Sequence, residues 1–371
     1  MARDYRVLLV DLAKGFGGAE VRVLTQAGAL QGVVQECKVA TLQGSVLHAR
    51  LQEEGLPHEV LTVSRSSPRL LLVLRGLIQR GGYQIVDAHN VQSILWGHLA
   101  AVLAGARGRV ATIHSDYGRE YSGLKGRFYE AVLWLNRRVV RQIINVTEVL
   151  QQKSEQAGDG HRSTLIHNAV PVPPHPYEGQ NTQLRNELGV TETDFVVGKI
   201  ARLKPVKGHK YLIEAFTHLS DRPDIKLVIV GDGPLEAELK AQVEALSLQE
   251  RVVFTGFRTD IPQVMQAVDC VCMASLSEAL PYTVLEAASY ARPLLVTEVG
   301  GLATLLANGE TAIMVPARDP QALAEGIRRL VEDPGMARQL GVAAYEMVRD
   351  SFSVDVMLES ILEVYDQAVQ T

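Results

Sequence analysis

The sequence predicts an α/β protein built from two doubly wound, parallel-sheet domains. Short apolar runs, each the length of a buried strand, alternate with segments of helical periodicity, and this alternation occurs twice along the chain. A proline-rich stretch over residues 171–181 separates the two series. The 371 residues also exceed what one ordinary hydrophobic core accommodates, and a content of 47% hydrophobic and 21% charged residues is typical of globular proteins.

The first series opens with an apolar strand over residues 5–12, which leads into Gly17 and Gly18 and then into a helix over residues 21–30. A strand, a glycine loop and a helix begin a doubly wound fold. Glu20 stands where a dinucleotide-binding fingerprint needs glycine, so we reject a nicotinamide cofactor. The glycines either let a ligand approach the backbone or form a tight turn. Further strands are expected at residues 38–42, 59–62, 85–88, 109–113, 143–146 and 164–166.

Two histidines follow strands of this half. His114 comes directly after the strand at 109–113, and the carboxyl ends of parallel strands face the crevice where such sheets bind ligands. We therefore predict a functional role for His114, with His89 as a weaker candidate; a structural role is the alternative. The segment 119–141 combines basic and aromatic residues, which is typical of an interfacial helix but also of an ordinary amphipathic helix with a solvated basic face.

The proline-rich stretch is typical of an interdomain linker because proline is stiff and cannot donate a backbone hydrogen bond. We therefore expect an N-terminal domain over residues 1–172, a linker over 173–181 and a C-terminal domain over 182–351. Apolar residues at helical spacing predict an amphipathic helix in the terminal segment, 352–371.

In the second half, strands are expected at residues 195–200, 225–230, 252–254, 268–273 and 294–296. Glycine or a charged residue follows each strand, so these loops are expected to line one crevice. The first loop carries Arg202 and Lys207, which are suited to hold a diphosphate. As isolated residues they would be solvated surface charges.

The stretch 273–297 contains the strongest signal for a ligand site. Pro281 suits the first position of a helix, because its missing N–H would have no partner there. The amides of Tyr282, Thr283 and Val284 would then lack intrahelical acceptors, and such a helix start is a seat for an anion, typically a phosphate.

Two carboxylates, Glu278 and Glu286, flank this expected anion seat. They would repel a phosphate but would accept hydrogen bonds from hydroxyls on the groups beside it, such as a ribose and a sugar. A surface loop followed by a helix with one exposed glutamate is the alternative.

Charge and cysteine content exclude several classes. Residues 1–178 hold 20 Lys and Arg against 15 Asp and Glu, whereas residues 179–371 hold 17 against 27. The first half therefore suits an anionic surface, but no nucleic-acid-binding motif is present. Three cysteines do not form a disulfide framework, the first residues do not read as a signal peptide, and no apolar run has membrane-spanning length. We expect a cytoplasmic protein, with a peripheral position at the cytoplasmic membrane face left open.

The order and spacing of these motifs resemble those of the GT-B retaining glycosyltransferases of family four (glycosyl transferases group 1). The segments that carry the resemblance are KIARLKPVKGHKYLIEAF, LVIVGDGPLEAELK, VVFTGFRTDIPQVMQAVD, SLSEALPYTVLEAASYARPLLVTEVGG and ANGETAIMVP, within residues 195–316. FGGAE, ATIHSDYG and SFSVDVMLESILEVYDQA are similar but less specific. The resemblance implies two Rossmann-like domains facing a central cleft, with the acceptor side on the first domain, the donor site on the second, and the terminal helix packed back on the first domain.

The family's pair of glutamates eight residues apart corresponds to Glu278 and Glu286. The resemblance implies that Glu278 contacts the donor-sugar hydroxyls and Glu286 the ribose. Arg202 and Lys207 would hold the diphosphate and stabilise the departing nucleotide, and His114 would lie near the donor sugar.

The nucleotide base would lie near Gly256, Phe257 and Arg258, held largely by backbone contacts. Ala279 replaces a glycine that many family members have, which affects the detail of the sugar pocket. The implied donor-binding set is completed by Gly17, Gly18, Gly231, Leu280, Pro281, Tyr282, Thr283 and Val284.

The expected function is transfer of a sugar, with retention of configuration and by front-side displacement, from a nucleotide-diphosphate sugar to a hydroxyl of a lipid, a polysaccharide or a small molecule. A UDP-sugar is favoured and a GDP-sugar is the second choice. No D-x-D sequence occurs, so neither a metal nor another cofactor is expected. A GT-B nucleotide-sugar epimerase or hydrolase, or a non-catalytic nucleotide-sugar-binding subunit, are the alternatives.

Overall fold

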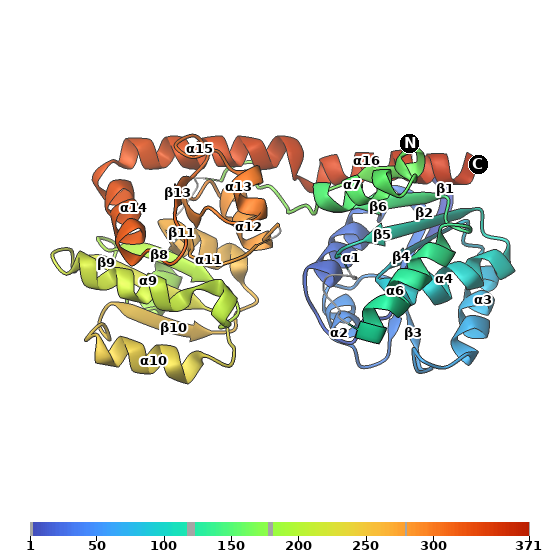
Figure 1. The fold of residues 1–371 in the computed structure, drawn as a ribbon, viewed down its shortest axis with the longest axis horizontal. Helices are drawn as coiled ribbons and strands as arrows, with labels where there is room; N and C mark the ends of the chain where they lie inside the picture. The colour runs from blue at the N-terminus through green and yellow to red at the C-terminus, as the bar shows by residue number, and fades with distance from the viewer. Residues whose placement is uncertain (1–2, 117–122, 177–180, 279, 371) are drawn as a thin grey trace. The chain divides into compact units, whose positions relative to one another are not determined.

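The structure, a computed structural model, describes residues 3–116, 123–176, 181–278 and 280–370. The chain forms two compact units, one made of Met1–Ala169 with Val354–Thr371 and the other of Val170–Ser353. Each unit is a parallel sheet with helices on its faces (Figure 1). The predicted α/β class with two Rossmann-like sheets is therefore confirmed.

Unit 1, the unit that contains both chain ends, has a seven-stranded sheet in the order β3-β2-β1-β4-β5-β6-β7. Its strands are β1 (Arg3–Asp11), β2 (Val34–Leu42), β3 (His58–Leu61), β4 (Ile85–His89), β5 (Gly108–Ile113), β6 (Gln142–Asn145) and β7 (Ser163–Leu165). All neighbours run parallel, and their register places Asp11 opposite His89 and His89 opposite Thr112. The polar carboxyl ends of three central strands therefore meet at one edge of the sheet.

The helices of unit 1 are α1 (Gly18–Ala29), α2 (Val46–Glu53), α3 (Arg69–Gly81), α4 (Val91–Ala104), α6 (Gly123–Asn136), α7 (Glu148–Gln156) and α16 (Val354–Gln370). At the start of α1 the carboxylate of Glu20 accepts a hydrogen bond of 2.6 Å from the backbone N–H of Gly17. Glu20 is thus a helix cap, which explains a glutamate at this place in the glycine loop. The apolar face of α16, including Ile361, Val364 and Tyr365, packs into the core of this unit.

Unit 2 has a six-stranded parallel sheet in the order β10-β9-β8-β11-β12-β13. Its strands are β8 (Phe195–Ile200), β9 (Ile225–Val230), β10 (Val252–Gly256), β11 (Cys270–Met273), β12 (Leu294–Thr297) and β13 (Ile313–Val315). The strand expected at residues 268–273 begins two residues later, at Cys270, so Val268 and Asp269 lie before it. The three-residue edge strand β13 was not predicted, since so short an apolar run has no recognisable period.

The helices of unit 2 are α8 (Thr182–Glu187), α9 (His209–Ala215), α10 (Glu236–Ala245), α11 (Ile261–Ala267), α12 (Tyr282–Ser289), α13 (Gly301–Leu305), α14 (Pro320–Glu332) and α15 (Pro334–Ser351), with short 3-10 turns at Pro205–Lys207 and Phe216–Leu219. Capping determines where several of them begin. The Asp319 carboxylate, for example, accepts the N–H of Ala322 at 2.9 Å and Pro320 occupies the first position of α14.

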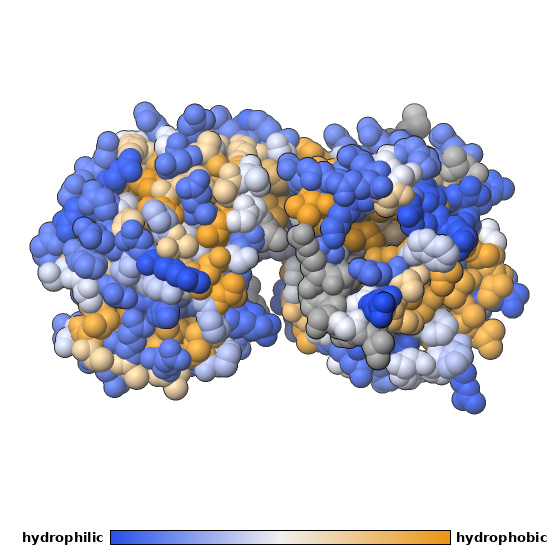
Figure 2. Space-filling model, in the orientation of Figure 1, coloured by the Kyte–Doolittle hydropathy of each residue, from blue (hydrophilic) through white to orange (hydrophobic). Residues whose placement is uncertain are grey.

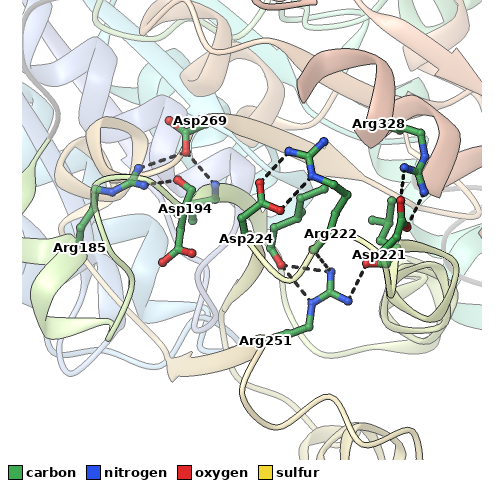
Figure 3. A network of polar contacts seen from close by, with 11 residues as sticks. Arg185, Asp194, Asp221, Arg222, Asp224, Arg251, Asp269 and Arg328 are labelled. Atoms are coloured by element: carbon green, nitrogen blue, oxygen red, sulfur yellow. Dashed lines mark hydrogen bonds and ion pairs between the residues drawn. The ribbon is translucent and has the colours of Figure 1, made fainter. Parts of the chain in front are cut away.

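A polar network supports the amino ends of the strands in unit 2 (Figure 3). Fully buried Arg185 donates to the carbonyl of Ala267 at 3.0 Å and pairs with Asp269, just before β11, at 3.1 Å. Arg222 pairs with Asp224, just before β9, at 2.7 Å. These charges are structural and lie at the amino-terminal ends of the strands, whereas the predicted ligand residues lie at the carboxyl-terminal ends.

Among the described residues, no helix combines the length and apolar character that crossing a membrane requires. The three cysteines, Cys37, Cys270 and Cys272, are buried free thiols within the sheets.

Candidate active site

The loops after β8 and β11 are held together at a glycine. Gly208 has a left-handed φ of 67°, and a side chain there would overlap the carbonyl oxygen of Ala274. Close by, the N–H of Leu276 donates to the carbonyl of Val206 at 2.8 Å. Only glycine allows this approach, so the two loops form one continuous surface.

A second glycine fixes the backbone of Glu278. Gly300, in the loop after β12, has a φ of 50°, and a Cβ at this position would collide with the carbonyl oxygen of Glu278. The N–H of Gly301 donates to the same oxygen at 2.9 Å. The loops after β8, β11 and β12 therefore hold Glu278 in place before any ligand binds.

Lys207 and Glu278 form the central ion pair of this surface. The Lys207 ammonium lies 2.7 Å from one carboxylate oxygen of Glu278 and 2.8 Å from the other. The glutamate side chain is only 7% exposed and the lysine side chain 25%. The structure thus brings two predicted residues together, although the sequence did not indicate that they would be partners.

A buried lysine that sequence reasoning missed lies on β8. Lys199 is fully buried, and its ammonium has no hydrogen-bond partner among the described residues. Burial lowers the pKa of Lys199 to about 8, and the charges that act on it include Glu278 and Lys207. Burial, followed by the charge of Lys199, lowers the pKa of His209 to about 3. The available signal was a lysine inside the otherwise apolar strand FVVGKI.

The start of α12 differs in part from the expectation. Pro281 is the residue before the helix, which begins at Tyr282, so the proline is not the first helical residue. The N–H of Val284 donates to the carbonyl of Pro281 at 3.1 Å, so this amide is not free for an anion, contrary to the prediction. The Thr283 hydroxyl donates to the carbonyl of Ile200 at 3.3 Å and ties the helix start to β8. An anion seat formed by the Tyr282 and Thr283 amides remains a prediction.

Glu286 lies one turn into α12 and differs from Glu278 in its surroundings. Among the described residues it has no ion-pair partner. Burial raises the pKa of Glu286 to about 7, so the carboxyl is only partly ionised near neutral pH. The two glutamates are thus chemically distinct, one held by a lysine and the other close to its own pKa.

The residues expected around the base lie at the end of β10 and in the loop that follows it, beside the loop after β9. The N–H of Gly231 donates to the carbonyl of Gly256 at 2.8 Å, which joins these loops. The Phe257 ring is exposed, at 70%. Arg258 binds Asp260 in a fork, with its Nε 2.8 Å from one carboxylate oxygen, so its guanidinium already has an anionic partner.

The remaining predicted residues of unit 2 have simple surroundings. Arg202 is exposed and forms no ion pair with a described residue. Leu280 is partly buried and packs against the core beneath α12. Ala279 lies outside the described residues.

Unit 1 places His114 against His89. The two rings stack with their centroids 5.2 Å apart, and Nε2 of His114 lies 2.9 Å from Nδ1 of His89. Burial lowers the pKa of His89 to about 3 and holds the pKa of His114 well below its usual value, so both rings are neutral at physiological pH. His89, treated as the weaker candidate, is thus the direct partner of His114.

The glycine loop of unit 1 also borders a buried carboxyl that sequence reasoning missed. Gly17 caps α1 and Gly18 is its first residue. Asp11, at the end of β1, is fully buried, and burial together with the charge of Glu20 raises its pKa to about 7. One of its oxygens accepts hydrogen bonds from the Ala13 N–H at 2.7 Å and from Asn90 at 3.1 Å.

Comparison with known proteins agrees with this geometry. The family described as glycosyl transferases group 1 matches residues 180–347, and the one described as glycosyltransferase family 4 matches residues 16–172. The chain is 27% identical over 274 residues to the Escherichia coli UDP-Gal:alpha-D-GlcNAc-diphosphoundecaprenol alpha-1,3-galactosyltransferase, covering 71% of this chain and 70% of that protein. It is 28% identical over 307 residues to the alpha-maltose-1-phosphate synthase of Mycolicibacterium smegmatis, covering 76% and 78%.

Among solved structures, Anabaena HepE in complex with UDP superimposes with a TM-score of 0.81 at 25% identity, covering 97% of this chain and 99% of that one. The same protein in complex with UDP-glucose gives a TM-score of 0.78 at 25% identity, covering 98% and 99%. The fold and the matching families define this protein as a glycosyltransferase of the GT-B class. More particularly, it belongs to the family-4 glycosyltransferases, with a group 1 domain in its C-terminal half.

Proposed function

We propose that this enzyme transfers a sugar from a UDP-sugar to a hydroxyl of a lipid-linked acceptor, with retention of the anomeric configuration and without a divalent metal. The observation that carries the proposal is the Lys207–Glu278 pair beside the start of α12, with the partly buried Glu286 one turn further. This arrangement offers a cation for a diphosphate and two carboxylates for the hydroxyl-bearing groups on either side of it.

The preference for UDP is supported by relatives. HepE was crystallised with UDP and with UDP-glucose, and the Escherichia coli relative is named for UDP-Gal. In the present chain, a base stacked on the exposed Phe257 ring and contacting the loop at Gly256 would be held without side-chain recognition of its edge, since Arg258 already has a carboxylate partner.

In the proposed reaction, the bond between the sugar C1 and the diphosphate oxygen breaks while the acceptor oxygen bonds to C1 on the same face. The acceptor proton passes to the departing phosphate oxygen, so no protein base is needed. Negative charge grows on the diphosphate in this step, and Lys207, Arg202 and the amides at the start of α12 would stabilise it. Glu278 would accept hydrogen bonds from the sugar hydroxyls. It would also orient the ammonium of Lys207.

The test is a set of UDP- and GDP-sugars incubated with a short lipid-linked sugar acceptor in the presence of EDTA. A glycoside whose anomeric proton coupling matches that of the donor is the expected product. Inverted product, transfer that EDTA abolishes, or trapping of a sugar on the protein would each contradict one stated part of the mechanism. Free sugar or an epimerised donor as sole product would favour the alternative hydrolase or epimerase activity.

A lipid acceptor is supported by the exposed faces of α3 and α4, which pack side by side in unit 1. Five apolar side chains on these faces are exposed, led by Leu72 at 63% and Leu103 at 52%; the others are Val73, Leu99 and Val102. This apolar area is visible over α3 and α4 (Figure 2). Neither helix contains an acidic residue, and α3 carries three arginines, Arg69, Arg75 and Arg80.

An apolar surface with a basic rim suits the headgroup region of an anionic membrane, so we assign peripheral membrane contact to this face. The segment 119–141, of which residues 119–122 lie outside the described part of the chain, stays a second candidate, because Phe128, Trp134 and Leu135 are exposed on its helix α6. Sedimentation with phosphatidylglycerol vesicles, compared with phosphatidylcholine vesicles, tests the assignment. Leu72→Glu with Leu103→Glu should release the protein, whereas Val149→Glu, an exposed apolar site on α7, should not. Equal binding by both variants would contradict it.

A further inference from the structure

A buried carboxylate lies behind the two stacked histidines of unit 1. Asp87, on β4, accepts hydrogen bonds of 2.8 Å from the Gln26 amide, the Tyr365 hydroxyl and the Thr112 hydroxyl. Gln26 also donates to the Tyr365 oxygen at 2.7 Å, so the tyrosine proton points to Asp87. These donors come from α1, α16 and β5. Burial, the largest effect, raises the pKa of Asp87, whereas the three hydrogen bonds and the charge of Arg22 lower it. Because all three groups donate to its oxygens, they favour the ionised carboxylate.

His89 lies between this carboxylate and His114. Its Nε2 is 3.7 Å from an oxygen of Asp87, and its Nδ1 is 2.9 Å from Nε2 of His114. One proton lies between the two rings, so only two arrangements of the neutral pair are possible. Either His114 donates to His89, which then carries its own proton on the side of Asp87, or His89 donates to His114 and turns a lone pair toward Asp87.

Electrostatics separates the two arrangements. A lone pair that faces a carboxylate in a fully buried site is repelled, because both carry negative charge density and little solvent screens them. An N–H that faces the carboxylate is attracted even at a distance too long for a hydrogen bond. The arrangement in which both rings carry the proton on Nε2 is therefore the more stable one.

We propose that Asp87, acting through His89, holds His114 in the Nε2–H tautomer, so that Nδ1 of His114 is a fixed hydrogen-bond acceptor for a sugar hydroxyl. Nδ1 of His114 has no hydrogen-bond partner among the described residues, so its lone pair is not used by another group there. The choice of a sugar hydroxyl as its donor rests on the proposed function; the tautomer does not.

His89 and Asp87 are positioning residues in this scheme, because neither contacts the sugar. They fix the role of Nδ1 of His114, so that this nitrogen accepts a hydrogen bond from a hydroxyl and does not donate one. The hydroxyl of Tyr365 extends the chain of contacts to α16 and helps to keep Asp87 ionised.

The tautomer is measured directly by long-range ¹⁵N–¹H correlation spectra of the ligand-free protein labelled at its ten histidines. His114 and His89, assigned with His114→Gln and His89→Phe, are both expected to show the Nε2–H pattern at pH 7. His98 is an internal reference: its Nε2 lies 2.8 Å from the Val110 carbonyl, which can only accept, whereas the Asn136 amide beside its Nδ1 can turn its NH2 group toward the ring and donate. An Nδ1–H pattern or a charged ring at His114 would overturn the proposal, and the wild-type spectrum decides this even if a variant does not fold.

The matched variants are His89→Phe and Tyr365→Phe. In His89→Phe the Nε2–H pattern of His114 should give way to a tautomer mixture. The kcat for transfer should fall roughly 10- to 100-fold, by analogy with the loss of groups that orient metal-binding histidines. The Kd for UDP, which lacks the sugar to be transferred, should stay within about twofold. Tyr365→Phe should keep the tautomer. Absence of transfer by wild-type enzyme would count against the proposed function alone, whereas an unchanged His114 spectrum and kcat in His89→Phe would refute the tautomer lock.

Discussion

The ammonium of Lys207 lies 2.7 and 2.8 Å from the two carboxylate oxygens of Glu278, a residue 71 positions further along the chain. The two side chains come from the loops after β8 and β11, and the glycine contacts at Gly208 and Gly300 hold these loops in place. An ammonium has three donors, so Lys207 can keep this contact and still bind a phosphate. Part of the charge that a departing diphosphate needs is therefore in position before substrate arrives.

Removal of this cation should mainly affect the chemical step. We expect Lys207→Ala to lower kcat by about 10²–10³-fold, as for other well-placed electrostatic groups. Lys204→Ala, at an exposed lysine of the same loop, is the matched control and should change kcat by less than about twofold. Steady-state transfer kinetics with both variants measures this, and a loss below about threefold in Lys207→Ala would contradict the role of Lys207.

The raised pKa of Glu286 predicts opposite effects on stability and binding. The carboxyl titrates at about 7 in the folded protein against 4.5 when unfolded, so the folded protein holds a proton that the unfolded chain releases in this range. Its ionisation therefore destabilises the fold progressively as pH rises from 4.5 to 7, and Glu286→Gln should stabilise the ligand-free protein at pH 8 by about 3 kcal/mol. Urea denaturation at pH 5 and pH 8 tests this, with the gain confined to the higher pH.

UDP binding to the same variant should follow the reverse pattern. An ionised Glu286 accepts ribose hydroxyls better than a protonated one, so wild-type affinity for UDP should rise as pH increases through about 7. The titration of UDP itself is common to both proteins, so the difference between wild type and Glu286→Gln isolates the carboxyl. A difference that is independent of pH between 6 and 8 would show that Glu286 does not titrate in the site.

Two glycines of unit 2 have nearly the same left-handed φ but different surroundings. Their alanine variants therefore allow the cost of the backbone conformation to be measured separately from the cost of a close contact. A Cβ added at Gly208 (φ 67°) would overlap the Ala274 carbonyl oxygen, whereas a Cβ added at Gly189 (φ 68°) would have no atom within 4 Å. Gly189→Ala should cost only the left-handed conformation, about 1 kcal/mol. Gly208→Ala should cost about 1–3 kcal/mol more and should also weaken UDP binding, because the loops after β8 and β11 must separate. Equal free energies of unfolding in the two variants would contradict the proposed loop contact.

The alternation of apolar and helical segments was enough to predict the α/β class and most strands, because buried parallel strands appear as continuous apolar runs. β13 was not predicted because a run of three residues is too short to show a strand periodicity. The prediction that the Val284 amide is free was wrong for a related reason. Helix periodicity does not reveal which carbonyl accepts the hydrogen bond of a first-turn amide, and here the acceptor is the carbonyl of Pro281.

For the candidate site, residue types and their positions after strands indicated Lys207, Glu278 and Glu286 but not their partners. The Lys207–Glu278 pair depends on loop contacts, which no local pattern encodes. Lys199 and Asp87 were missed because a charged residue inside an apolar run gives no sign of what faces it. His89 was undervalued because its importance comes from the stacked ring of His114.

The most direct measurement is calorimetric titration of UDP, GDP and ADP into the metal-free protein, the Glu286→Ala variant and the Lys207→Ala variant. We predict that UDP binds wild type, that GDP binds more weakly or not at all, and that either variant weakens UDP binding by at least about tenfold, or 1.4 kcal/mol. Absence of binding by any nucleotide, or UDP binding that both variants retain in full, would contradict the assignment of the donor site to the loops of unit 2.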